Sequence, residues 1–252
     1  MKSNTLHAIY ILWLRQIKRY FRSKSRMIGS LGQPILFLVA LGYGLGGVIK
    51  SADGGSYIQF LAPGIIAMSI LFTAIFSGIE IIWDRQFGFL KETLVAPVSR
   101  FTIMFGRTLG GATVASFQGI IVLIISVVAG FRPEIINIFP AFVFMILIAL
   151  VFTALGTAIA SMLEDMQGFQ LIMNFVVMPV FFLSGALFPL DSAPAAIRGI
   201  AFINPLSYGV DGLRAVLIGA SHWNVWTDAT VLALISVAFI GIGAWLFSKI
   251  KI

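Results

Sequence analysis

Long apolar stretches dominate the chain and are separated by short polar segments. Six of them are long enough to cross a bilayer as helices, which takes roughly 20 apolar residues each. They lie at about residues 29–49, 60–82, 106–130, 138–162, 169–189 and 229–248. Barrel strands would be about ten residues long and would alternate between apolar and polar positions. The pattern therefore predicts an all-α polytopic membrane protein with six transmembrane helices.

A different pattern precedes the first of these stretches, over residues 4–26. Apolar and basic side chains there take opposite faces of a helix. The apolar set is Leu6, Ile9, Tyr10, Trp13, Leu14, Ile17, Tyr20 and Phe21, and the basic set is Arg15, Lys18, Arg19, Arg22 and Arg26. Such a pattern is typical of an amphipathic helix lying in the membrane interface. The alternative is a charge cluster that only orients the chain, and both interpretations place the N-terminus in the cytoplasm.

Residues 190–218 are apolar enough to suggest a seventh crossing, but proline and glycine interrupt them repeatedly. Proline disfavours helical backbone in the residue before it, so Asn204-Pro205 divides the stretch into pieces too short to cross. We therefore predict a re-entrant helix pair before the last span, at roughly 194–203 and 206–218. Irregular backbone survives at membrane depth only where protein buries it or where it lines a cavity.

Composition and charge agree with a membrane protein. Of the 252 residues, 59% are hydrophobic and 11% are charged, whereas a soluble domain carries about 25% charged residues. With six spans, 13 of the 17 Lys and Arg residues fall on one side. Cytoplasmic loops carry such an excess, so both termini are predicted to face the cytoplasm. Because the basic residues cluster beside apolar spans, they suit membrane lipids as partners and not nucleic acid.

The polar segment between the second and third predicted spans runs from Trp83 to Arg100. Phe87, Leu90 and Leu94 form an apolar stripe along it, with most of the charged residues elsewhere. A loop that only joined two spans could be far shorter, and aromatic side chains among mixed charges are typical of a docking surface. The alternative is an interfacial helix that anchors the two spans.

Polar residues inside the predicted spans are few, and each has a structural as well as a functional interpretation. Glu80 is a candidate for the substrate pathway, or it reaches the interface or pairs with Arg85. Interhelical hydrogen bonds are the first expectation for three amide residues, and substrate contacts the second: Gln118, Gln170 and Asn174. Phe181 and Phe182 are candidates to face a pathway, although aromatic residues more often fill packing or face lipid.

Two local features favour particular helix contacts. G-x-x-x-G spacing at Gly42–Gly46 and Gly106–Gly110 lets helices approach closely, although such spacing is common by chance. In the re-entrant segment, Asp211 and Arg214 lie three positions apart, so their opposite charges can neutralise each other.

Motifs for chemistry are missing from the sequence. Without a Gly-Lys dipeptide the phosphate-binding loop G-x-x-x-x-G-K-[ST] cannot form. The chain has no cysteine, and its two histidines are isolated, so clustered metal ligands are not expected. We therefore expect no catalytic, cofactor-binding or metal site in this chain. An intramembrane enzyme is less favoured than a secondary carrier or channel, which itself would need ionisable groups near mid-membrane.

Three segments, in order and spacing, resemble ABC-2 type transporter permeases, the membrane subunits of bacterial and archaeal exporters of drugs, lipids and polysaccharides. They are Leu61-Ala62-Pro63-Gly64, the loop from Arg85 through Gly88, Lys91 and Leu94 to Pro97, and the run from Leu183-Ser184-Gly185 and Phe188-Pro189 through Asn204-Pro205-Leu206-Ser207-Tyr208 to Arg214. The resemblance covers essentially the whole chain, as one ABC-2 transmembrane domain over residues 1–252.

This resemblance implies partners and residue roles. Two permease copies, here a homodimer, would each dock on a separate ATPase subunit that holds ATP and Mg and drives an amphiphilic substrate outward. The coupling helix would span about residues 84–95, with help from the second cytoplasmic loop. The implied coupling residues are Arg85, Phe87, Gly88, Leu90, Lys91, Leu94, Glu164 and Asp165. The re-entrant residues implied to cap the pathway are Asn204, Pro205, Tyr208, Asp211 and Arg214.

Overall fold

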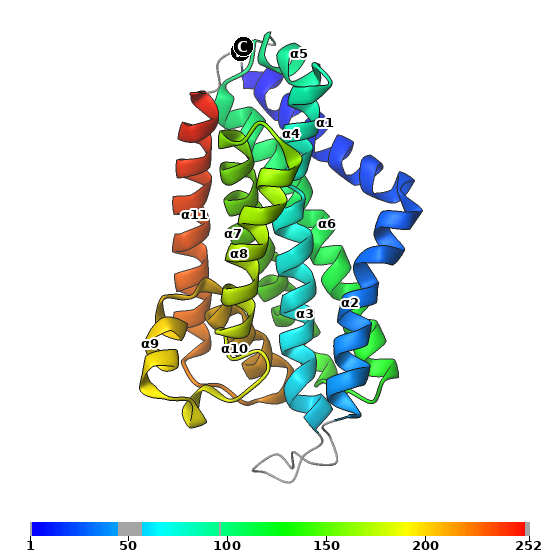
Figure 1. The fold of residues 1–252 in the computed structure, drawn as a ribbon, viewed down its shortest axis with the longest axis vertical. Coiled ribbons are helices and arrows are strands. Elements are labelled where there is room, and N and C mark those ends of the chain that lie inside the picture. Colours follow the sequence, from blue (N-terminus) through cyan, green and yellow to red (C-terminus); the bar gives the residue numbers. More distant parts are fainter. Residues whose placement is uncertain (1, 45–56, 96, 250–252) are drawn as a thin grey trace.

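The computed structural model describes residues 2–44, 57–95 and 97–249, and these ranges contain helices and connections but no strand (Figure 1). The α-helices are α1 Lys2–Arg22, α2 Lys24–Gly42, α3 Tyr57–Phe76, α4 Ile79–Gln86, α5 Phe89–Val95, α6 Arg100–Val128, α7 Ile138–Met162, α8 Met166–Phe182, α9 Ala195–Ile203, α10 Pro205–Ile218 and α11 Val225–Ser248. Two short 3-10 helices, Ile135–Asn137 and Leu190–Ser192, precede α7 and α9.

The core of the molecule is a bundle of long helices around α7. This helix packs against α3, α6, α10 and α11. It is apolar along its whole length and matches the predicted span 138–162, because a helix with several helical neighbours has little need of a polar face. Figure 1 shows α5, the start of α1 and the end of α11 at one end of the bundle, and α9 and α10 at the other.

The described residues contain four helices long and apolar enough to cross a membrane: Tyr57–Gln86, Arg100–Val128, Ile138–Met162 and Val225–Ser248. A fifth candidate is the pair Thr5–Arg22 and Met27–Gly42, which bends by 73°. The structure therefore supports four or five of the six predicted spans.

The remaining predicted span, 169–189, is only partly helical. Its helix α8 has 17 residues and ends at Phe182. Turns follow, and Gly185 adopts a φ of +77°, a left-handed conformation that glycine reaches without strain. The last third of this predicted span, residues 183–189, is therefore wrong as a helix.

Helix α1 ends at Arg22, so the amphipathic helix is shorter than the predicted range 4–26. It lies along α6, where Gly106 and Gly110 leave room for it. A Cβ added at Gly110 would lie 2.6 Å from Cβ of Gln16, and one at Gly106 would lie 3.0 Å from Cβ of Leu12. The Gly106–Gly110 spacing therefore forms a close helix contact, whereas Gly46 of the other predicted spacing lies outside the described residues.

We expect Gly110→Leu to detach α1 from α6, because the larger side chain overlaps Gln16. The chain contains no cysteine, so a cysteine pair at positions 13 and 113 can be cross-linked without background. Cross-linking should fall sharply in Gly110→Leu and persist in Gly241→Leu, where an added Cβ has no neighbour within 4 Å. Equal cross-linking in both variants would contradict this packing.

The predicted coupling helix over residues 84–95 is wrong as one continuous element. Residues up to Gln86 complete α4, and α5 begins at Phe89. Between them Gly88 has a φ of +82°, which a helix cannot accommodate. The segment therefore consists of two short helices joined by a turn.

The outer predicted helices, 194–203 and 206–218, correspond to α9 and α10 within one residue at each end. Asn204 lies between them as the N-cap of α10. Its Oδ1 accepts a hydrogen bond from the N–H of Leu206 at 3.0 Å, and its Nδ2 donates to the carbonyl of Val180 at 2.7 Å. Pro205 occupies the first turn of α10, where its missing N–H costs nothing.

Candidate coupling site and internal cavity

A buried ionic cluster connects three helices at the α5 end of the bundle. Its centre is Asp84 of α4, whose residue surface is 1% exposed. The Asp84 carboxylate pairs with Arg15 of α1 at 2.7 Å, with Arg19 of α1 at 3.4 Å and with Arg107 of α6 at 2.5 Å. Arg107 is buried as completely as Asp84, whereas the two arginines of α1 are partly exposed.

Glu80 joins this cluster one helical turn before Asp84. Its carboxylate pairs with Arg19 at 3.1 Å, and not with Arg85, which was one of the alternatives that the sequence left open. Arg85 instead donates hydrogen bonds to the carbonyls of Leu163 and Ser161, each at 2.8 Å. Among the described side chains, three arginines thus meet two carboxylates, and a displacement of α4 acts directly on α1 and α6.

The surface around α5 exposes part of the predicted coupling residues and buries another part. Phe87 and Phe89 are 70% and 50% exposed, and Lys91 is also exposed, whereas Leu90 is 2% exposed. The side chain of Leu94 lies outside the described part. This end of the molecule therefore presents two aromatic side chains, with Leu90 packed beneath them.

The second predicted contact loop lies beside α4. Gln86 donates a hydrogen bond from Nε2 to the carbonyl of Glu164 at 3.3 Å, which links the end of α4 to the α7–α8 connection. The Glu164 side chain is exposed, and Asp165 caps α8 by accepting a hydrogen bond from the N–H of Gly168. The structure therefore brings together the two segments that the resemblance to ABC-2 permeases implied as contacts of the ATPase subunit.

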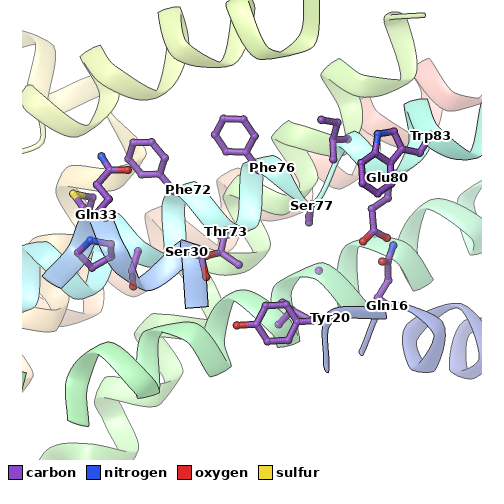
Figure 2. Close-up of a pocket in the computed structure, with 17 residues that line it drawn as sticks. Gln16, Tyr20, Ser30, Gln33, Phe72, Thr73, Phe76, Ser77, Glu80 and Trp83 are labelled. Carbon is purple, nitrogen blue, oxygen red and sulfur yellow. The ribbon is translucent and has the colours of Figure 1, made fainter. Parts of the chain in front are cut away.

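A partly open cavity of about 520 Å³ lies next to the cluster, between α1 and α2 on one side and α3, α4 and α6 on the other (Figure 2). Its polar lining residues are Gln16, Tyr20, Ser30, Gln33, Ser69, Thr73, Ser77 and Glu80, and its larger apolar residues are Pro34, Met68, Phe72, Phe76, Ile79, Trp83 and Val114. Known small-molecule sites have volumes of about 300–1,000 Å³ and combine mostly apolar walls with a few polar groups. The cavity matches that description.

The predicted pathway residues do not form one site. Glu80 lines the cavity, whereas Asn174 and Phe182 lie on the exposed face of α8. Phe181 is buried, and its ring packs against that of Phe37 with centroids 6.1 Å apart. Gln118 makes the expected interhelical hydrogen bond, accepting from the hydroxyl of Tyr20 at 2.6 Å.

Among the described residues, Asp211 and Arg214 form no direct ion pair with each other. Each has its own hydrogen-bond partners. The Asp211 carboxylate accepts hydrogen bonds from the N–H groups of His222 and Trp223, both at 2.8 Å. The Arg214 guanidinium donates to the carbonyl of Gly185 at 3.2 Å and lies 3.9 Å from the ring centroid of Phe60. These contacts hold α10 against the segments around it, and Tyr208 stacks on Trp223 there.

Sequence reasoning did not single out Asp84 and Arg107 as partners, or Gln33 and Thr73 as cavity residues. A signal for the first pair was present, because a charged residue inside an apolar helix needs a partner. No signal marked the second pair, since the cavity depends on the bend between α1 and α2.

The family model described as ABC-2 type transporter matches residues 7–218, which include the cluster, α5 and the residues that line the cavity. The chain belongs to this family. Nodulation protein J of Rhizobium leguminosarum bv. viciae is 30% identical over 237 residues, covering 91% of each chain. Inner membrane transport permease YadH of Escherichia coli K12 is 28% identical, covering 92% of this chain and 91% of its own. Putative transport permease ycf38 of Cyanophora paradoxa is 27% identical, covering 92% and 81%.

Membership in the ABC-2 family confirms the resemblance derived from the sequence. Together with the apolar helices, it identifies the chain as a multi-pass membrane protein and a transport permease subunit. Two of these relatives are named as permeases, and none of the three is named as an enzyme.

Proposed function

We propose that this permease subunit moves an amphiphilic substrate outward across a cell membrane, driven by ATP that a separate subunit hydrolyses with Mg. The observation that carries the proposal is the ionic cluster of Asp84, next to two exposed aromatic residues, Phe87 in the turn after α4 and Phe89 at the start of α5. A motor that pressed on Phe87 and Phe89 would displace α4, and Asp84 would transmit that displacement to α1 and α6. The partner drives transport only if it binds one permease conformation more tightly than the other.

Charge supports an orientation with the α5 end in the cytoplasm. The basic residues of α1 and the α4–α6 region lie at this end, as does the end of α11 (Figure 1). Loops rich in Lys and Arg stay on the cytoplasmic side. In this orientation both termini and the aromatic pair face the compartment that holds ATP, and α9 and α10 cap the outer side.

The exposed face of α8 supports pairing with a second copy of the chain. The buried residues of α8 form a single stripe, Phe169, Met173, Val177 and Phe181. Beside it, Gln170 and Asn174 are exposed, and Phe175 is 83% exposed. Amide groups facing lipid would lose hydrogen bonds, so a partner surface or a polar pathway is the favourable environment for them. In the proposed homodimer this face, with α2 and α3, borders the pathway.

The test replaces the two exposed aromatic residues at the α4–α5 turn with the double variant Phe87→Asp/Phe89→Asp. Purified permease is combined with the ATPase subunits of its source organism in lipid vesicles, and ATP hydrolysis and transport are measured. We expect the variant to insert normally but to lose binding of the ATPase and ATP-dependent transport, because charged side chains replace the docking contacts.

The matched control is Ile136→Asp, which changes an exposed apolar residue near the other end of the bundle. It should keep ATPase binding and transport. If Phe87→Asp/Phe89→Asp transports as well as the unchanged chain, α5 is not the motor contact. If transport proceeds at the same rate without ATP, the chain is a secondary carrier.

A further inference from the structure

A second pocket lies at the α5 end of the bundle, where residues from the C-terminal ends of α4, α7 and α11 come together. Its volume is about 610 Å³. The charged members of its lining are Arg85, Glu164 and Lys249, and Met162 and Trp245 contribute apolar surface. None of these residues lines the cavity beside the Asp84 cluster, so the two hollows are separate.

Two cations and one carboxylate give this pocket a net positive charge. Lys249 is exposed, and its Nζ lies 3.4 Å from the ring centroid of Trp245. Hydrogen bonds to two carbonyls at the end of α7 hold the Arg85 guanidinium in the wall. Glu164 is exposed, and among the described residues neither it nor Lys249 forms an ion pair. The pocket therefore offers an unpaired ammonium group and a fixed guanidinium to an anion.

An apolar stripe on the outer side of α11 leads to the pocket. Leu234, Val237, Ile242 and Trp245 are each more than half exposed. This helix is the least buried of the four long apolar helices, and Figure 1 shows it on the opposite side of the bundle from α2. In the proposed homodimer α8, α2 and α3 border the pathway, which leaves the outer side of α11 to lipid. Tryptophan side chains favour the membrane boundary, so Trp245 places the pocket at head-group depth.

We propose that this pocket binds the head group of an anionic phospholipid, with its phosphate between Lys249 and Arg85 and an acyl chain along the exposed stripe of α11. Basic pockets between spanning helices on the cytoplasmic side bind such head groups. Glu164 opposes the anion but is exposed, so its carboxylate can turn toward solvent. The bound lipid would bridge the ends of α4 and α11, beside the turn that carries Phe87. Lipid binding at this site does not require the ATPase subunit.

The experiment mixes the full chain, purified in detergent, with equal amounts of phosphatidylglycerol and phosphatidylcholine that have the same acyl chains. Native mass spectrometry then measures which lipid stays bound. We expect phosphatidylglycerol to be retained about fivefold more than phosphatidylcholine, the effect of one basic residue near a membrane surface. Lys249→Gln should lose this preference, whereas Lys91→Gln, an exposed lysine of α5, should keep it. Glycerol phosphate in excess should not displace the lipid, because it has no acyl chain.

Glu164→Gln provides a second variant with an effect of opposite sign. Removing the carboxylate should strengthen the binding of phosphatidylglycerol, because the repulsion of the phosphate is lost. A site built for a zwitterionic head group would instead use this carboxylate to hold an ammonium group. Weaker binding in Glu164→Gln, an unchanged preference in Lys249→Gln, or equal retention of the two lipids by the unchanged chain would overturn the proposal. Displacement by glycerol phosphate would also overturn it, as it would show a site for free phosphate.

Discussion

Asp84→Asn is expected to destabilise the permease by about 3–5 kcal/mol, the usual cost of removing one partner from a buried ion pair. The cost arises mainly at Arg107, which is buried and would keep its positive charge without a carboxylate. Arg15 and Arg19 are partly exposed and can turn toward solvent. The fraction of folded protein after detergent extraction, followed by size-exclusion chromatography over a temperature series, measures the effect.

Two further variants separate the effect of unpairing Arg107 from the effect of removing any acidic residue. Glu134→Gln removes an exposed carboxylate near the opposite end and should unfold like the unchanged chain. Adding Arg107→Met to Asp84→Asn removes the unpaired charge, so the double variant should recover much of the lost stability. If Asp84→Asn alone unfolds at the same temperature as the unchanged chain, the cluster does not hold α1, α4 and α6 together.

Gly156→Val is the second substitution with a large expected effect, because it forces two backbones apart. A Cβ at Gly156 would collide with the backbone of Ile75, and one at Gly78 would collide with the backbone of Gly156. Overpacking of a core costs about 1–3 kcal/mol when side chains can yield. Here the added side chain meets backbone atoms, which cannot move aside as side chains do. We therefore expect the yield of folded protein to fall at least as far as a loss of about 1–3 kcal/mol implies.

The matched control for this prediction is Gly241→Val in α11. Both glycines lie in long apolar helices, but an added Cβ at Gly241 has no neighbour within 4 Å. The control should therefore be produced and purified at the level of the unchanged chain. Similar yields of the two variants would show that α7 does not approach the α3–α4 turn as closely as described.

The sequence predicted helices wherever the apolar stretch had no internal break. The span 138–162 and the helix α7 coincide, and α9 and α10 begin and end within one residue of their predicted positions. The Asn204-Pro205 dipeptide correctly predicted the boundary between α9 and α10. Breaks at Ser23, Gly88 and Leu183 were missed, because each depends on a local backbone conformation or a tertiary contact that apolar periodicity does not encode.

The exposed part of the candidate site could be predicted from the sequence, whereas the buried ionic cluster could not. The pattern of aromatic and charged residues indicated the surface at Phe87, and the resemblance to ABC-2 permeases implied the α7–α8 loop. The cluster joins Arg15, Asp84 and Arg107, which are distant in the chain, and a single sequence gives charges without their pairing. Arg107 lies within α6 and donates a hydrogen bond to Asp84.

Helix α8 packs against the bundle through a single stripe of residues, and this affects how the sequences of such subunits can change in evolution. Its four fully buried residues recur every fourth position and fix it to the bundle, while outward positions such as Leu171 and Phe175 are exposed. In the proposed pair, the choice between an identical and a related neighbour would then depend on a few outward positions such as Gln170, Asn174 and Phe175. Gene duplication followed by substitutions there would suffice to turn a symmetric assembly into one with two distinct halves.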